Sequence, residues 1–225
     1  MENELKNNNT NDIYSDKKKL ALLVIERLKK AYLDSGCSLI YDEPWKLLVS
    51  VRLAAQCTDE RVNVIVEELF KAYPTINALA DASVSDIESI IRPCGLSKGK
   101  SKDISNCMKM LRDEFDGVIP CDLNLLLKLP GVGRKSANLI MGDIFNKPAI
   151  VTDTHCIRLC NRIGLVDSIK DPKKVEMELW KIIPPEEGNS LCHRFVDHGR
   201  AVCSARTKPN CKECVLADIC KYNNS

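Results

Sequence analysis

Helical signals follow one another along nearly the whole chain, and no segment is suited to a sheet. Apolar residues recur at helical spacing, as in Leu20, Val24 and Leu28, which places them on one face of a helix. The expected helices are 17–34, 44–55, 59–72, 85–92, 102–115, 122–128, 134–144, 153–163, 172–183 and 187–200. Residues 117–120 and 148–152 read as extended segments, but both are too short for a sheet. The sequence therefore predicts an all-α protein with short connections.

The composition supports a folded core and excludes several classes of protein. Hydrophobic residues make up 44% and charged residues 28% of the 225 residues, as in globular domains. No apolar run approaches the roughly 18 residues that span a bilayer, so we expect no membrane attachment. Residues 1–16 are polar and lack the apolar core of a signal peptide. We interpret them as a disordered tail and expect a cytoplasmic protein, associated with the nucleoid if the cell is prokaryotic.

Twelve cysteines are many for a chain without a secretion signal, in which disulfides are not expected. We interpret eight of them as small buried hydrophobic residues: Cys37, Cys57, Cys94, Cys107, Cys121, Cys156, Cys160 and Cys192. The other four, Cys203, Cys211, Cys214 and Cys220, follow the pattern C-x7-C-x2-C-x5-C. Structural zinc sites usually combine two close pairs of ligands, and only one close pair is present here. The uneven run favours a 4Fe–4S cluster, with zinc as the alternative.

The sequence Leu-Pro-Gly-Val-Gly-Arg-Lys, residues 129–135, separates two expected helices. Pro130 ends the first helix, because the residue before a proline is disfavoured in the α conformation. Gly131 and Gly133 permit positive φ and carry no side chain that would hold another backbone away. The second helix begins at once, and its free N–H groups suit a phosphate. The alternative is an ordinary corner between two helices of a bundle.

Four motifs together resemble the endonuclease III family of helix–hairpin–helix DNA glycosylases. They are LAAQCTD, LPGVGRKSAN, VTDTHCIRLCNR and HGRAVC, and the resemblance runs from about Trp45 to Cys220. It implies a two-lobed fold. One lobe is a six-helix domain over 36–147, and the other joins 17–35 to 148–225. It also implies a base excision repair enzyme that removes oxidised pyrimidines from duplex DNA and cuts 3′ to the abasic site by β-elimination.

The resemblance assigns the chemistry to Lys135 and Asp153, which we expect in the cleft between the lobes. In the family the lysine amine attacks the deoxyribose C1′, displaces the base and forms a Schiff base. The aspartate helps to activate the lysine and stabilises positive charge on the sugar. Attack needs a neutral amine, at least transiently. Without the resemblance, Lys135 would be interpreted as a phosphate contact and Asp153 as a helix N-cap.

The resemblance also predicts how the protein contacts DNA. Gln56 and Leu96 match the residues that enter the base stack when a nucleotide is extruded, a role that suits an amide and an apolar wedge. Otherwise they would be a helix-terminal polar residue and a core or loop leucine. We interpret the neighbouring Lys98, Lys100 and Lys102 as phosphate contacts. The other expected DNA contacts are Gly131, Val132, Gly133, Arg134, Arg200, Arg206 and Lys208.

The resemblance implies one 4Fe–4S cluster on the four C-terminal cysteines, with the family spacing C-x6-C-x2-C-x5-C. This chain has one residue more in the loop Ser204–Asn210, where an insertion is easily accommodated. The expected partner is damaged double-stranded DNA, bound by a monomer. Two alternatives remain at this point. An adenine glycosylase of the same superfamily normally lacks a lysine at position 135, and a non-catalytic DNA-binding module would have no use for Lys135 and Asp153 together.

Overall fold

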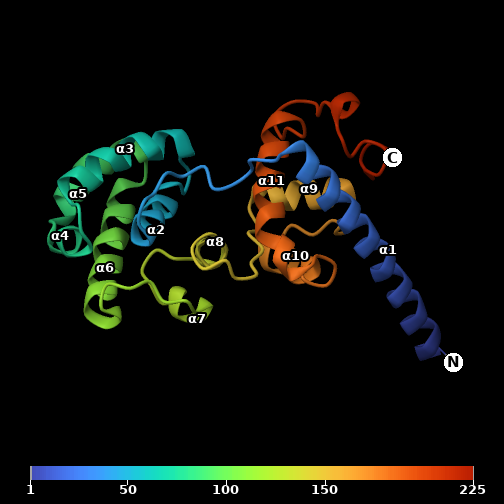
Figure 1. Ribbon diagram of the computed structural model, residues 1–225, viewed down its shortest axis with the longest axis horizontal. Coiled ribbons are helices and arrows are strands. Elements are labelled where there is room, and N and C mark those ends of the chain that lie inside the picture. The colour runs from blue at the N-terminus through green and yellow to red at the C-terminus, as the bar shows by residue number, and fades with distance from the viewer. Residues whose placement is uncertain (1, 225) are drawn as a thin grey trace. The chain divides into compact units, whose positions relative to one another are not determined.

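The computed structural model describes residues 2–224, and every regular element in that range is a helix (Figure 1). The α-helices are α1 (Glu2–Ala31), α2 (Pro44–Leu53), α3 (Asp59–Ala72), α4 (Ile76–Asp81), α5 (Val84–Ile91), α6 (Ser97–Phe115), α7 (Leu123–Leu126), α8 (Arg134–Asp143), α9 (Thr154–Ile163), α10 (Pro172–Leu179) and α11 (Gly188–Ala201). Short 3₁₀ helices are η1 (Arg92–Cys94), η2 (Pro185–Glu187) and η3 (Cys211–Glu213). The predicted all-α class is confirmed. None of the described helices has both the length and the apolar character that a bilayer crossing requires.

The chain divides into two compact units. The first, Cys37–Asn146, is continuous in sequence and carries the 129–135 hairpin, so we call it the hairpin unit. The second combines the chain through Gly36 with the chain from Lys147 onward, and we call it the cysteine unit. Each unit has its own buried side chains, and each is described separately below.

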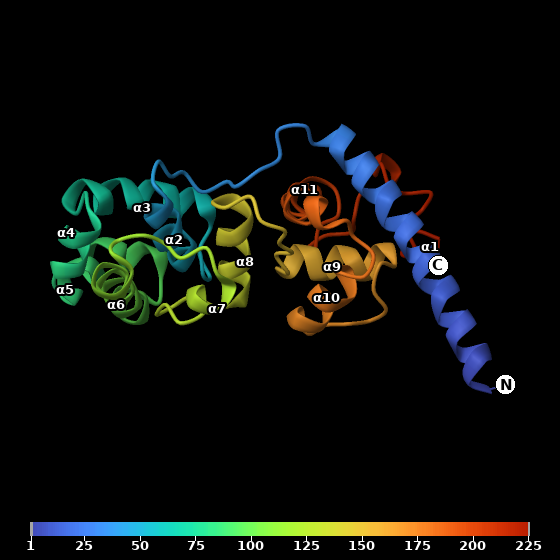
Figure 2. The same ribbon diagram turned by 60° about the horizontal axis from the view of Figure 1, so that its bottom comes forward.

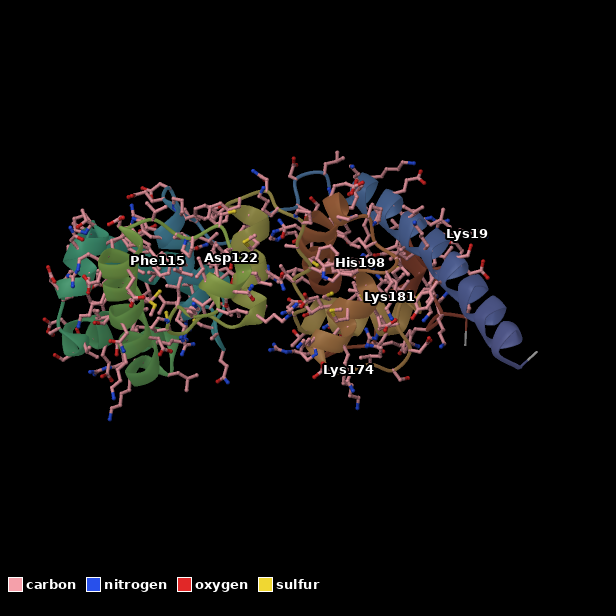
Figure 3. The ribbon with its side chains drawn as sticks, turned by 90° about the horizontal axis from the view of Figure 1, so that it is seen from below. Lys19, Phe115, Asp122, Lys174, Lys181 and His198 are labelled. Atoms are coloured by element: carbon pink, nitrogen blue, oxygen red, sulfur yellow. The ribbon has the colours of Figure 1, made fainter. Side chains whose placement is uncertain are left out.

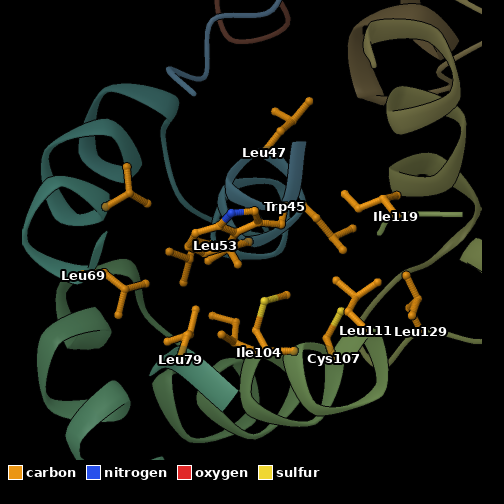
Figure 4. Close-up of a cluster of buried hydrophobic side chains, with 14 of the residues drawn as sticks. Trp45, Leu47, Leu53, Leu69, Leu79, Ile104, Cys107, Leu111, Ile119 and Leu129 are labelled. Carbon is orange, nitrogen blue, oxygen red and sulfur yellow. The ribbon is translucent and has the colours of Figure 1, made fainter. Parts of the chain in front are cut away.

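The hairpin unit is built around the long helix α6. Helices α4 and α5 pack along α6, while α2 contacts α3, α6 and α8 (Figure 2). Apolar side chains from these helices meet in one cluster, which includes Trp45, Leu69, Leu79 and Leu111 (Figure 4). Burial of this much apolar surface is the main force that holds such a bundle together.

Local capping explains where several helices of this unit begin. Thr58, Thr75 and Ser83 each accept a hydrogen bond from a backbone N–H in the first turn of the helix that follows. The unit contains seven α-helices rather than the six predicted, because the Thr75 cap starts the short helix α4. The sequence also suggests Ser85 as the start of the next helix, but the cap is Ser83.

The cysteine unit packs α1 and α9 against α11. Buried Leu28 of α1, Leu159 of α9 and Phe195 of α11 belong to its core. Figure 3 shows His198 among these helices, while the exposed Lys174 points outward. Five of the eight scattered cysteines are buried, as predicted: Cys94, Cys107, Cys156, Cys160 and Cys192. Cys37 and Cys57 are half-buried, and for Cys121, which is exposed, the prediction is wrong.

Helix α1 begins at Glu2, within the segment 1–16 that the sequence interpretation predicts to be a disordered tail. Tyr14 donates a hydrogen bond from its hydroxyl to Glu178 Oε2 at 3.0 Å, and Lys181 donates to the Tyr14 hydroxyl at 2.9 Å. Lys17 pairs with Asp167 at 2.5 Å. These contacts hold the middle of α1 on its unit, and extending a formed helix costs far less than nucleating one.

Candidate DNA-repair site and cysteine pocket

Of the two glycines in the hairpin at 129–135, only Gly131 uses the positive φ that a glycine permits. Gly131 has φ +78°, a region that residues with a Cβ rarely adopt. A Cβ at this position would also lie 2.8 Å from Asp103 Cβ and 2.9 Å from Arg52 Cδ. Gly131 is therefore required both for its backbone conformation and for the space beside these two side chains. Gly133 differs, because its φ is −94° and nothing lies within 4 Å of a Cβ added there.

An ion pair between Arg52 and Asp103 lies against the hairpin at Gly131. Arg52 of α2 donates from Nε to Asp103 Oδ2 at 2.8 Å, and its Nη2 lies 2.6 Å from the same oxygen. Both side chains are partly buried, and both contact the position where Gly131 turns the chain. A two-contact arginine–carboxylate pair has a defined geometry. It therefore fixes the hairpin relative to α2 and α6. The sequence analysis did not identify either residue.

Lys135 follows Arg134 in the first turn of α8, and its side chain is exposed. Gly133 is the N-cap of this helix and has no side chain to cap it. The backbone N–H groups of a first helical turn point out of the helix start, where a phosphate can bind. Arg134 and Val132 on either side of Gly133 are half-buried. The local geometry therefore combines an exposed amine with an uncapped helix N-terminus.

Asp153 lies in the cysteine unit and is the N-cap of α9, as the alternative interpretation predicts. Its Oδ1 accepts a hydrogen bond from the backbone N–H of Cys156 at 2.7 Å. The residue is half-buried and follows the buried segment Ala149–Thr152. The cap bond fixes the carboxylate at the start of the helix, which is the local reason for an aspartate here.

Gln56 and Leu96 both lie in loops of the hairpin unit and share an unusual backbone. Gln56 has φ +57° and Leu96 has φ +49°, the left-handed region that costs a non-glycine residue of the order of 1–2 kcal/mol. Both side chains are exposed, that of Leu96 by 58%. An exposed leucine held in such a conformation is unusual for a residue without a surface role.

One of the three lysines next to Leu96 is not where the sequence interpretation puts it. Lys98 and Lys102 are exposed, but Lys100 is fully buried. Its amine donates hydrogen bonds to the backbone carbonyls of Leu53 at 2.7 Å and Cys94 at 2.8 Å. Burial lowers the pKa of this amine. Lys100 therefore does not contact phosphate, and that part of the interpretation is wrong.

The four C-terminal cysteines line a single pocket. Arg162, His198 and Tyr222 line it as well. Arg162 donates to Cys203 Sγ at 3.2 Å, and the Leu216 backbone N–H donates to Cys214 Sγ at 3.4 Å. Donors to sulfur stabilise thiolate ligands.

The donor set of this pocket is suited to an iron–sulfur cluster. Four cysteine thiols are the usual ligands of a 4Fe–4S cube. A zinc ion also accepts four thiolates, at about 2.3 Å from one point. The residues that line the pocket therefore fit a metal group held by cysteine.

The sequence analysis missed the polar side chains behind this pocket. His198 accepts or donates at Nδ1 to the Tyr32 hydroxyl at 2.9 Å, and its Nε2 lies 3.4 Å from Cys214 Sγ. Burial lowers the pKa of His198 to about 4, so this ring is neutral at pH 7. Arg158 donates to the carbonyl of Cys203 from Nη2 at 3.1 Å. No sequence pattern connects these residues to the cysteines.

The loop that carries the additional residue is closed by its own hydrogen bonds. Ser204 Oγ accepts from the backbone N–H of Arg206 at 3.2 Å, and the Asn210 N–H donates to the carbonyl of Val202 at 3.1 Å. Arg206 and Lys208 are exposed on this loop, as is Arg200 at the end of α11. The expected basic residues are therefore on the surface beside the pocket.

Comparison with known proteins identifies the family. Residues 49–185 match the HhH-GPD superfamily of base excision DNA repair proteins. The chain is 44% identical to endonuclease III of Synechocystis over 207 residues, which cover 92% of this chain and 94% of the relative. It is 34% identical to the Escherichia coli K12 enzyme over 201 residues, 89% of this chain and 94% of that one. The chain belongs to the endonuclease III family.

A solved structure agrees with this assignment. The fold matches that of a trapped endonuclease III–DNA covalent intermediate with a TM-score of 0.87 and 36% sequence identity, over 92% of this chain and 97% of the other. Members of the endonuclease III family are DNA glycosylases with AP lyase activity. The chain is therefore an enzyme of base excision DNA repair, a DNA glycosylase and AP lyase.

Proposed function

We propose that the enzyme removes oxidised pyrimidines from duplex DNA and cuts the strand 3′ to the resulting abasic site, with Lys135 as the nucleophile. The observation that carries the proposal is the exposed Lys135 amine on the first turn of an uncapped helix, directly after the hairpin. Backbone N–H groups at this helix start suit a DNA phosphate. A phosphate bound there would bring the sugar of a neighbouring nucleotide within reach of the amine.

The proposed reaction begins when the neutral Lys135 amine attacks C1′ of the deoxyribose. The bond from C1′ to the base breaks, and the departing base takes up a proton. The nitrogen, which has given up a proton, then forms a double bond to C1′ while the C1′–O4′ bond breaks and O4′ takes up a proton, which leaves a protonated Schiff base on the lysine. Loss of a proton from C2′ expels the 3′ phosphate, which cuts the strand.

Asp153 has two tasks in this proposal. Its Oδ1 already accepts the cap bond from Cys156, so Oδ2 is the oxygen left for the reaction. That oxygen takes the proton from Lys135 or stabilises positive charge that develops on the sugar. Lys135 is exposed in the protein alone, so bound DNA must supply the desolvation that favours a neutral amine.

We propose that one 4Fe–4S cluster is held by Cys203, Cys211, Cys214 and Cys220. The four thiols share a pocket with donors to sulfur, which supports this assignment. The cluster would be structural, shaping the loop that carries Arg206 and Lys208 toward DNA phosphates.

DNA binding in this proposal begins with phosphate contacts from the hairpin, Gly131–Arg134, and from Arg200, Arg206 and Lys208. Gln56 and Leu96 then fill the space that the extruded nucleotide leaves. We propose that the enzyme works as a monomer in the cytoplasm, associated with the nucleoid if the cell is prokaryotic.

Borohydride trapping on a duplex with one oxidised pyrimidine tests the nucleophile. We expect a covalent adduct with the wild type and with Lys109→Ala, which removes an exposed lysine of α6, and none with Lys135→Ala. An adduct with all three proteins would move the nucleophile to another amine. Base release without any adduct would indicate a glycosylase that uses water. If the wild type gave no base release and no adduct, this result would contradict the proposed substrate class.

A further inference from the structure

The most unusual side chain of the hairpin unit is the buried Lys100. It is 0% exposed, whereas lysines are almost never fully buried without a partner. Its two hydrogen-bond partners are backbone carbonyl oxygens, those of Leu53 and Cys94. In the described part of the chain, its amine forms no ion pair with a carboxylate. An amine held in this way is costly for stability alone, which suggests another reason for its presence.

The two carbonyls belong to the segments that lead into the proposed wedge residues. Leu53 is the last residue of α2, just before the loop that carries Gln56. Cys94 ends η1, just before Gly95 and Leu96. One ammonium group thus connects the bases of two loops that are 40 residues apart in the chain, from Gln56 to Leu96.

Other contacts bring the same two loops together. Arg61 of α3 donates from Nη1 to the carbonyl of Pro93 at 3.4 Å. Burial, followed by the neighbouring Cys57 thiol, raises the pKa of the Cys94 thiol to about 11. Gln56 directly precedes Cys57, Leu96 lies two residues after Cys94, and both have positive φ. Such conformations persist only where the surrounding structure holds them.

We propose that Lys100 is a positioning residue that sets the spacing of the two wedge loops, so that Gln56 and Leu96 enter the same gap in the duplex. The inference rests on the proposed roles of those two residues. Lys100 does not touch the DNA; it acts through the backbone of both loops. Its loss would leave the chemistry at Lys135 intact and make extrusion of the nucleotide slower.

The test uses Lys100→Met, which keeps the length of the side chain and removes its donors. Single-turnover base release is measured on a fully paired duplex and on a duplex in which the damaged nucleotide is bulged, and therefore already unstacked. We expect a decrease of about 10- to 100-fold on the paired duplex, because extrusion costs a few kcal/mol there. On the bulged duplex we expect a change within about twofold. An equal decrease on both substrates would overturn the proposal.

Two further variants test the role of Lys100 separately from the wedge roles of Gln56 and Leu96. Lys109→Met, on the exposed side of α6, should behave as wild type on both duplexes. Leu96→Ala should be slower on the paired duplex only, and the double variant with Lys100→Met should show less than the product of the two single effects. No effect of Leu96→Ala would remove the wedge role. If the effect of the double variant equalled the product of the two single effects, the role of Lys100 would be overturned, while the wedge role of Leu96 would stand.

If Lys100→Met does not fold, hydrogen exchange on the wild-type enzyme tests the proposal instead. The probe is a duplex with a tetrahydrofuran abasic analogue. We expect the amides of residues 54–57 and 95–97 to gain protection together when this duplex binds, because one buried amine connects both loops. Protection confined to one of the two loops would overturn the proposal.

Discussion

The two units of this enzyme are stabilised in different ways. The hairpin unit has one apolar cluster that joins α2 through α8. In the cysteine unit, the segment after α11 has little apolar burial: among residues 202–224, only Pro209 and Leu216 are buried apolar side chains. Arginines of α9 hold this segment through hydrogen bonds to Cys203 and Ser204. Packing therefore suffices for the first unit, whereas the end of the second depends on polar contacts and, by our proposal, on a cluster.

The largest effect should come from Asp153, where the cap and the proposed chemistry can be separated. Asparagine caps helices about as well as aspartate. The free energy of unfolding of Asp153→Asn should therefore lie within about 0.5 kcal/mol of the wild-type value. Its excision rate should fall by about 10²–10⁴, because the carboxylate is lost. Urea unfolding and single-turnover base release measure the two quantities.

Asp153→Ala is the matched variant, since it loses both functions of the side chain. It should have the same low rate and be about 1 kcal/mol less stable. If Asp153→Asn were as fast as the wild type, Asp153 would be a cap and nothing more.

Loss of the proposed cluster should lower the local stability of the cysteine unit and leave that of the hairpin unit unchanged. In Cys214→Ser, we expect amides in residues 202–224 to exchange at least about tenfold faster, because ligand binding contributes to local folding. Amides of α6 should keep their protection, because that helix is held by the apolar core. Hydrogen exchange with mass spectrometry, together with iron analysis, checks this. Unchanged exchange in a protein without iron would contradict a structural role for the cluster.

The hairpin gives a third contrast, this time within one unit. Gly131→Ala should destabilise the protein by about 1–3 kcal/mol, because φ is +78° and its Cβ would meet Arg52 and Asp103 at less than 3 Å. Thermal unfolding of the variant measures the loss.

Gly133→Ala is the control, because its φ is −94° and the space around it is open. Its stability should change by less than about 0.5 kcal/mol. If a phosphate approaches the start of α8, its affinity for duplex DNA should nevertheless fall, as measured by fluorescence anisotropy at fixed salt. Normal affinity would argue against that phosphate site.

The sequence predicts the class of fold and the local backbone better than it predicts which side chains are buried. Helical periodicity and the Pro-Gly-x-Gly turn depend on neighbours in the chain, and both are correct. The burial of Lys100 is an example that its charge does not predict. It lies one helical turn before the buried Ile104, in register with Cys107 and Leu111, so the same periodicity places it on the buried face of α6.

Other residues have no such signal. His198 and Arg158 reach the cysteine pocket because α11 and α9 pack together, and that packing is a property of the tertiary fold. The N-terminal helix is a similar case. The Asn-rich start predicts disorder, but Tyr14 anchors the helix through contacts with Glu178 and Lys181.

That anchor gives the smallest predicted effect. The hydrogen bond from Lys181, followed by the one from Tyr14, lowers the pKa of Glu178 below its ordinary 4.5. A lowered carboxyl pKa stabilises the folded state above about pH 4.5, and this contribution disappears as pH falls through the folded value. Because the pair is partly exposed to solvent, Glu178→Gln should cost only about 0.2–1 kcal/mol at pH 7 and less near pH 3. Urea unfolding at both pH values tests this, and an equal difference at the two would show that packing, not charge, holds α1 in place.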